Sequence, residues 1–187
     1  MAERRDRPPE GGLIAMRQAI DAIDDQILDL LERRILLSQG TVAAKQASTG
    51  SLHIRPEREA AILERLIRRA RVLDAEVVQI IWRELMGQGR QAQSPLGLVL
   101  CAAKDHERFE LHVRSHFGCT APVTWVSDSA TAFERARTEP VIAVVQEDPG
   151  TAVGELRRFD AVEDRAGNIV GYALGRVASE TAAPGED

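Results

Sequence analysis

Aromatic side chains are scarce in this chain: phenylalanine, tyrosine and tryptophan make up only 4% of its 187 residues. The hydrophobic share is nevertheless 44%, so the core has to be built from leucine, isoleucine, valine and alanine, which suits helix packing. Cysteine is scarce as well. The two cysteines, Cys101 and Cys119, form no CxxC pair and suggest no disulfide framework.

Two further features are missing, and each argues against a class of protein. No apolar run reaches the roughly 18 residues that a membrane span needs, and no apolar segment follows the charged N-terminus as it does in a secretory signal. The formal net charge of -5 argues against general nucleic-acid binding, because contacts to phosphate dominate that affinity. We therefore expect a soluble cytoplasmic protein that contacts neither membrane nor nucleic acid.

The length of the chain allows one ordinary domain or two small ones, and the residue patterns favour two. Residues 13–93 are predicted to be helical and residues 96–178 to form a small α/β domain, which makes the fold class α+α/β. Residues 1–12 and 179–187 are predicted to be disordered tails, because they are polar and offer too little apolar surface to bury.

The segment from Leu13 to Ala47 contains no proline and predicts one long helix. Apolar residues recur at alternating spacings of four and three, as in a heptad seam: Met16, Ile20, Ile23, Ile27 and Leu30. A helix of about 35 residues extends for roughly 50 Å. It cannot bury its seam within a monomer of this size, so we expect a second copy of the chain to cover it.

Residues 48–56 are predicted to form a turn between this helix and a second one. Gly50 breaks the first helix, and Pro56 stands in the first turn of the second, where a proline costs no hydrogen bond. The second helix is expected to run from Pro56 to Arg71 with four residues inward: Ile62, Leu63, Leu66 and Ile67.

A third helix is predicted to begin after Asp74, a plausible N-cap. Its apolar residues again recur at helical spacing: Val77, Val78, Ile81, Trp82, Leu85 and Met86. Two glycines then leave two possibilities open, because the helix either stops at Gly87 or continues to Gln93.

The second half of the chain alternates between strand-like and helix-like segments. Strands are predicted at LGLVLCA, APVTWVS, PVIAVVQE and NIVGYALGRVA, and helices at DHERFELHVRSHFG, DSATAFERART and TAVGELRRF. This alternation indicates a small α/β domain with a mostly parallel sheet.

Each of the three predicted helices also directs polar groups along its apolar face. Arg34 occupies a seam position of the first helix, and Lys45 follows eleven residues later, about three turns along the same face. Glu59, next to Arg58, is in register with the apolar residues of the second helix, and Gln93 continues the apolar face of the third. Because cations are almost never buried without a partner, this excess of positive charge predicts an anionic ligand.

Arg17 adds information about geometry, because it precedes Arg34 by seventeen residues. On an ideal helix the two are roughly 25 Å apart and about 100° apart around the axis, so they cannot easily serve one site from the same chain. In an antiparallel dimer, the partner's Arg17 could reach the site of Arg34. Taken singly, each polar residue also has a structural alternative, such as a solvated arginine, a register-setting seam charge or a partner of a helix dipole.

These residues resemble a known family. MRQAIDAIDDQILDLLERR, AAK, RPERE and WRELMGQGRQAQ correspond, in order, to the three helices of the all-helical class of chorismate mutase. The resemblance covers residues 13–93 and implies an intertwined homodimer whose long first helices pair antiparallel. It also implies that each of the two active sites borrows one arginine from the other chain.

The resemblance implies a role for each polar residue. Arg34 and the partner's Arg17 would bind the two carboxylates of chorismate, and Arg58 would help to hold a carboxylate or order the site. Glu59 would accept a hydrogen bond from the ring hydroxyl. The chain departs from the pattern at Arg55, a position that is acidic in some members of the family.

Two more residues would act on the reacting bond, because the resemblance implies that Lys45 and Gln93 donate hydrogen bonds to the ether oxygen of chorismate. The implied reaction is the rearrangement of chorismate to prephenate in aromatic amino-acid biosynthesis, and it needs no nucleophile, metal or cofactor. The substrate must be held in a compact conformer, and the negative charge that grows on the ether oxygen must be stabilised.

Two other functions stay open at this point. One is an isochorismate pyruvate-lyase on the same scaffold, and the other is a non-catalytic dimeric module that senses a ligand. The second half of the chain faintly resembles the first part of a prephenate dehydratase domain, in the order of its strands and in FERARTEPVIAVVQED. It is too short for that two-lobed enzyme, so we expect a regulatory or degenerate domain.

One pair of histidines has a spacing that is also found in metal sites. His112 and His116 are spaced i, i+4, with Cys119 nearby. A metal site needs at least a third ligand with good geometry, so we interpret the pair as part of a solvated helix face.

Overall fold

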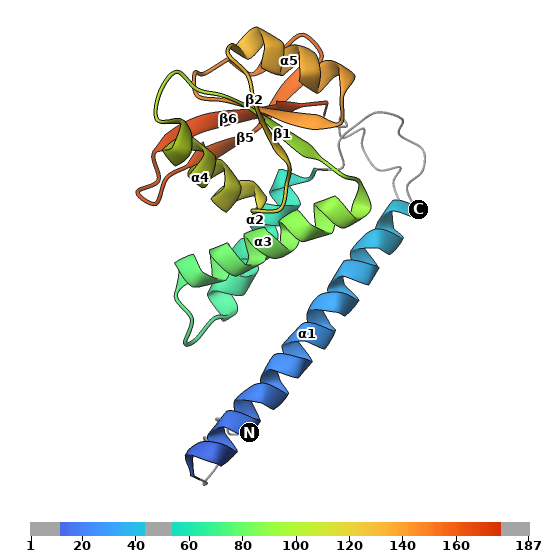
Figure 1. Cartoon of the computed structure of the whole chain (residues 1–187), viewed down its shortest axis with the longest axis vertical. Helices are drawn as coiled ribbons and strands as arrows, with labels where there is room; N and C mark the ends of the chain where they lie inside the picture. Colours follow the sequence, from blue (N-terminus) through green and yellow to red (C-terminus); the bar gives the residue numbers. More distant parts are fainter. Residues whose placement is uncertain (1–11, 44–53, 177–187) are drawn as a thin grey trace, which may run out of the picture.

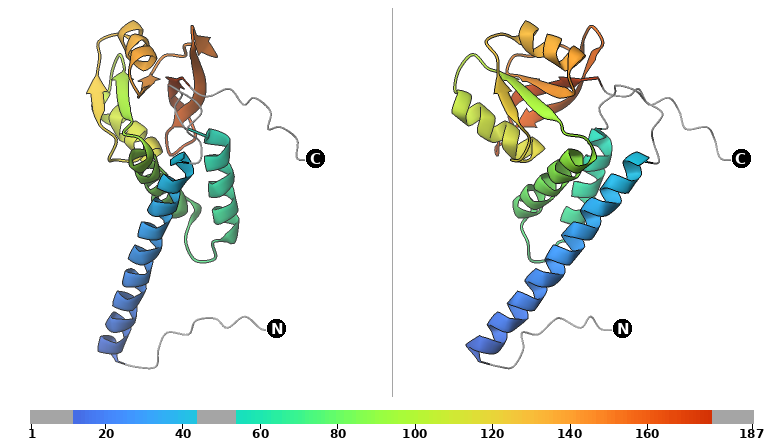
Figure 2. Two further views of the ribbon diagram at one scale, coloured as in Figure 1. Left: turned by 90° about the vertical axis from the view of Figure 1, so that its right-hand side faces the viewer. Right: turned by 45° about the vertical axis from the view of Figure 1, so that its right-hand side comes forward.

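The computed structural model describes residues 12–43 and 54–176, in which a helical region precedes a six-stranded sheet (Figure 1). Three helices form the helical region: α1 (Leu13–Ala43), α2 (Pro56–Arg69) and α3 (Ala75–Gln93). α3 contacts both of the other helices, while α1 runs outward as a long rod (Figure 2). Both predicted tails fall almost wholly outside the described residues, as does the turn over 48–53.

α1 has 31 described residues, which corresponds to a length of about 46 Å. The predicted seam lies exposed along this helix, with exposed fractions from 42% at Met16 to 64% at Leu30. Such a row of large apolar side chains is a surface to which a partner can bind. The predicted end of this helix, residues 44–47, lies outside the described residues.

α2 begins at Pro56, as predicted, and ends two residues earlier than expected, at Arg69. Acidic residues in its first turn and basic residues in its last turn match the helix dipole. Its predicted inward side chains are half-buried: Ile62, Leu63, Leu66 and Ile67. Asp74 is the N-cap residue of α3, as predicted. Of the two ends that the sequence left open for this helix, the structure shows the later one: α3 passes through Gly87 and ends at Gln93.

The sheet contains six strands: β1 (Gly97–Cys101), β2 (Val123–Trp125), β3 (Val141–Val145), β4 (Ala152–Val153), β5 (Leu156–Glu163) and β6 (Ile169–Gly175). Their order is β2-β1-β3-β6-β5-β4. β1 pairs in parallel with β2 and β3, whereas the other three pairings are antiparallel. The prediction of a mostly parallel sheet is therefore wrong: the sheet is mixed, because short turns rather than crossover helices connect β4, β5 and β6.

The helix predicted for TAVGELRRF is also wrong. This segment forms β4 and the start of β5, with Gly154 at φ 63° in the turn between them. Leu156 is completely buried, and β5 pairs along its length with β6. The composition of the segment suits a helix, but pairing and burial in the sheet override that local preference.

One helix covers each face of the sheet (Figure 1). α4 (His106–Phe117) packs on one face through Phe109, Val113 and Phe117, and α5 (Ser129–Thr138) packs on the other through Ala132, Phe133 and Ala136. Alternate residues of β1 point to the two faces, as expected for a strand buried on both sides. The core under α4 also contains Ile54, which anchors the start of α2 to the sheet.

Both of these helices begin and end within one or two residues of the predicted segments. Within the described ranges, none of the helices is both long and apolar enough to cross a membrane.

Candidate functional site

Arg34 lies on the side of α1 that faces α3. Its side chain is half-buried, and Nη1 donates a hydrogen bond of 2.8 Å to the carbonyl oxygen of Leu85. The two helices are close here, because a Cβ atom on Gly89 would lie 3.6 Å from Ser38 Oγ and 3.8 Å from Arg34 Nη1, both ordinary contacts. The seam position that the sequence singled out therefore directs its guanidinium to the second half of α3.

The electrostatic surroundings of Arg34 have two opposing effects. Burial lowers the pKa of Arg34 below its ordinary value, and the negative charge of Glu59 works in the opposite direction. The charge of Glu59 on α2 therefore acts on Arg34 on α1. Two of the predicted site residues, from different helices, share one electrostatic environment.

Arg90 on α3 is a third charged side chain beside Arg34 and Glu59, and the sequence analysis missed it. We refer to these three residues as the cluster. Arg90 Nη1 donates to Glu59 Oε1 at 2.5 Å, and the exposed fractions of the two side chains are 10% and 29%. Arg90 Nη2 donates to the carbonyl oxygen of Phe117 at 2.9 Å. Arg90 follows the buried Met86 by four residues, and this spacing was a signal for an inward arginine.

Three other predicted residues are placed by the structure but are not part of this cluster. Arg17 is exposed on α1, roughly 25 Å along the helix from Arg34. Arg58 is exposed on α2, and Gln93 is a half-buried residue at the end of α3. Lys45 lies outside the described residues. The structure therefore brings together Arg34 and Glu59, adds Arg90, and leaves Arg17 distant within the chain.

The histidines of α4 do not form the solvated face that we expected. His116 Nε2 donates to Asp160 Oδ2 at 2.8 Å, and its Nδ1 accepts from Arg83 on α3, since a guanidinium can only donate. His112 Nε2 is buried without a hydrogen-bond partner. His116 thus contributes to the contact between α3, α4 and β5. In the described part of the chain, His, Cys, Asp and Glu residues form no group of three that could hold a metal.

The Arg34–Glu59–Arg90 cluster has defined chemical abilities. A guanidinium is a strong ligand for a carboxylate, and a carboxylate accepts hydrogen bonds from a hydroxyl group. With two arginines and one carboxylate among these three residues, the cluster has an excess of positive charge. It therefore suits an anionic ligand that also carries a hydroxyl.

Comparisons with known proteins concern the same part of the chain. Residues 16–94 match the family described as chorismate mutase type II. The chain is 34% identical over 89 residues to a bifunctional chorismate mutase/prephenate dehydratase from Stutzerimonas stutzeri. That alignment covers 45% of this chain and 24% of the relative, so the chain spans only part of the relative's length. No solved structure matches the chain significantly.

The family match runs from the first turn of α1 to the residue that follows α3. It therefore includes all three residues of the cluster and all six site residues predicted from the sequence, of which Lys45 alone lies outside the described residues. The resemblance inferred from the sequence motifs is confirmed: the helical part of the chain, residues 16–94, is similar to the type II chorismate mutases.

Proposed function

We propose that the helical region, residues 13–93, is a chorismate mutase that converts chorismate to prephenate. The observation that carries the proposal is Arg34, an arginine held half-buried against α3 beside the charge of Glu59. A pure scaffold has no need for such a cluster, because burying charge costs free energy unless it is paired or binds a ligand. The match to the type II family supports the same assignment.

In the proposed reaction a C–O bond breaks and a C–C bond forms within one molecule of substrate. Arg34 binds one carboxylate of chorismate, and Glu59 accepts a hydrogen bond from the ring hydroxyl. Lys45 and Gln93 donate to the ether oxygen, on which negative charge grows in the transition state. These donors accelerate the reaction because they bind the transition state more tightly than the ground state.

Arg90, the second arginine of the cluster, is paired with Glu59, so the second carboxylate requires a further arginine. We assign it to the partner's Arg17, in a homodimer whose α1 helices pair antiparallel, and Arg58 helps to order the site. The exposed apolar seam of α1 supports this arrangement, because a partner helix would cover it. Each proposed active site is therefore shared between two chains.

The proposal gives the remaining parts of the chain secondary roles. The region 96–178 is a regulatory or degenerate domain attached to the catalytic one. Cytoplasmic localisation belongs to the same proposal, and it is supported by Cys101 and Cys119, which are both free thiols, as is usual in a reducing compartment.

The test is to incubate the purified full chain with chorismate, follow the loss of chorismate absorbance and identify the product. We expect prephenate, and we expect Arg34→Ala to lower kcat/KM on the order of 100-fold or more. Arg33→Ala is the matched control, because Arg33 is an exposed neighbour on the same helix. Absence of turnover, or an Arg34→Ala variant as active as the control, would contradict the proposal.

A further inference from the structure

We propose that Arg90 is a positioning residue with two roles. It holds Glu59 away from Arg34, and it ties the proposed active site to the part of the chain that contains the six-stranded sheet, residues 96–176, which we call the sheet region. This inference rests on the proposed mutase function for its kinetic consequences. It also goes beyond that function, because it assigns the sheet region an effect on the proposed site.

The evidence begins with the two ends of the guanidinium. Arg90 Nη1 donates to Glu59 on α2, while Nη2 donates to the carbonyl oxygen of Phe117, the last residue of α4. The Arg90 guanidinium carbon also lies 5.8 Å from the centre of the Phe117 ring. The Arg90 side chain is only 10% exposed, and it links its own helix, α3, to α2 of the helical region and to α4 of the sheet region.

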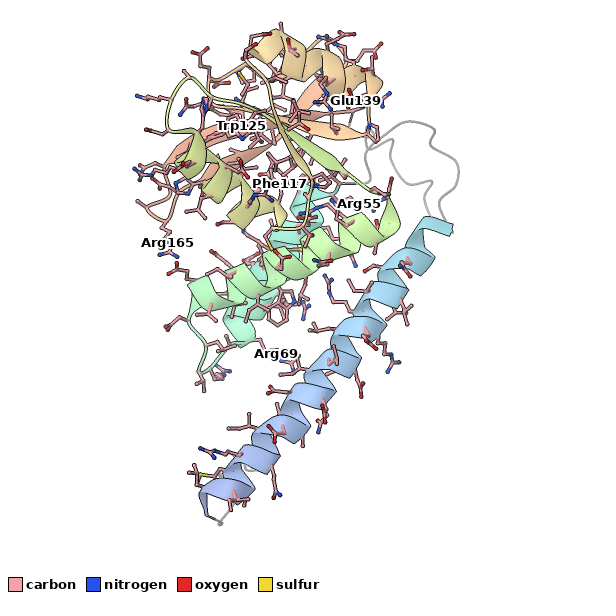
Figure 3. The ribbon with its side chains drawn as sticks, viewed as in Figure 1. Arg55, Arg69, Phe117, Trp125, Glu139 and Arg165 are labelled. Carbon is pink, nitrogen blue, oxygen red and sulfur yellow. The ribbon has the colours of Figure 1, made fainter. Side chains whose placement is uncertain are left out.

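The acceptor on α4 is held in place by contacts of its own. Gly87 and Gly118 meet with almost no space between them, because a Cβ atom on Gly87 would lie 2.6 Å from the Phe117 carbonyl oxygen. Glu84 accepts a hydrogen bond of 2.8 Å from the backbone N–H of Cys119. Figure 3 shows Phe117 where α4 approaches α3. The sheet region therefore determines where the Arg90 side chain lies.

The consequence for the site follows from the alternative partner of Glu59. The charge of Glu59 already acts on Arg34, where it opposes the effect of burial on the pKa. If Arg90 were absent, Glu59 would lose its ion-pair partner, and its carboxylate would be free to turn toward Arg34. Glu59 would then compete with the substrate carboxylate for Arg34, so substrate would bind more weakly.

The decisive experiment compares steady-state kinetics of the full-length protein with Arg90→Met, Glu59→Gln and the double variant. We expect Arg90→Met to raise KM for chorismate by about tenfold, within the range of coupling between contacting residues, with a smaller change in kcat. Adding Glu59→Gln to Arg90→Met should lower KM again, because the neutral glutamine no longer competes for Arg34 but still offers a side-chain oxygen to the ring hydroxyl. A merely structural role of Arg90 would not produce this rescue.

Arg83→Met is the matched control. Arg83 lies on the same helix and contacts His116 of α4, so its loss weakens the contact between the two regions without touching Glu59. We expect its KM to stay within about twofold of the wild-type value, as for sites without shared partners. An equal rise of KM in both arginine variants, or a double variant with a KM no lower than that of Arg90→Met, would overturn the inference.

A second measurement separates this inference from the proposed function. Urea unfolding of the unsubstituted protein, Arg90→Met, Glu59→Gln and the double variant forms a double-mutant cycle that needs no turnover. Independent effects of Arg90→Met and Glu59→Gln in this cycle would overturn the inference even in an active enzyme. Coupled effects in a protein without chorismate turnover would support the pairing of Arg90 with Glu59 and refute the mutase function alone.

Discussion

The contact between α3 and α4 can be tested by a single methyl group, introduced as Gly87→Ala. A Cβ atom at this position would lie 2.6 Å from the carbonyl oxygen of Phe117 and 3.1 Å from Gly118 Cα. Both neighbours are backbone atoms, so no side chain can rotate away and the two helices must separate. The hydrogen bond from Arg90 to the same carbonyl oxygen would lengthen with them.

The magnitude follows from opposing contributions. Alanine favours the helix over glycine by about 1 kcal/mol. Overpacking costs about 1–3 kcal/mol, and loss of a hydrogen bond from a charged donor costs about 1.5–3 kcal/mol. We therefore expect Gly87→Ala to lower the free energy of unfolding by about 1.5–5 kcal/mol, which combines the terms above.

The assay is urea unfolding at a fixed protein concentration, with Gly89→Ala as the matched control. Gly89 lies two residues further along α3, and a Cβ atom there would meet its nearest neighbour at 3.6 Å, an ordinary contact. The control should be neutral or up to about 1 kcal/mol more stable. A Gly87→Ala variant as stable as this control would refute the reasoning that the backbones of α3 and α4 are in direct contact.

Three further predictions concern other parts of the molecule. Ile23→Glu on the exposed seam should convert a dimer to a monomer in light scattering, whereas Ala22→Glu on the other side of α1 should not; two monomers or two dimers would contradict the proposed interface. Burial alone raises the pKa of Asp160, but its hydrogen bonds and nearby positive charges outweigh this and hold the pKa below its ordinary value. The carboxylate thus adds stability that is present at neutral pH and is lost as pH falls below about 4, so Asp160→Asn should unfold with a weaker acid dependence; an unchanged dependence would contradict this. Trp125→Phe removes the 2.8 Å hydrogen bond to the Glu110 carboxylate and shrinks a ring that stacks on His106, so it should cost about 1.5–3 kcal/mol in urea unfolding; no cost would contradict a stabilising role of this contact.

The sequence predicted elements well where local signals are strong. Pro56 marks the start of α2, and Gly118, at φ 92°, follows the end of α4, as expected for residues that begin and end helices. The prediction of a helix where the chain forms β4 and the start of β5 failed for a physical reason. Its local composition favours a helix, whereas its structure depends on pairing with β6, a strand that follows later in the chain.

The candidate site could be predicted only in part. The seam position of Arg34 and the inward register of Glu59 are periodic features within single helices, so spacing alone reveals them. The four-residue spacing from Met86 indicates that Arg90 points inward, but its partners come from two other helices, α2 and α4, so spacing within α3 does not reveal the salt bridge. The histidine pair was misinterpreted for the same reason, since Asp160 and Arg83, which bind His116, lie on other elements.

The central claim is an active site that combines Arg34 of one chain with the partner's Arg17. It is tested most directly by mixing two inactive variants, Arg17→Ala and Arg34→Ala, under conditions that exchange subunits. Half of the dimers would then contain one chain of each kind, and each of these would have one intact site. The account predicts recovery of about one quarter of wild-type chorismate mutase activity, the fraction of intact sites in a statistical mixture of symmetric dimers. Activity that stays at the level of the separate variants would contradict it.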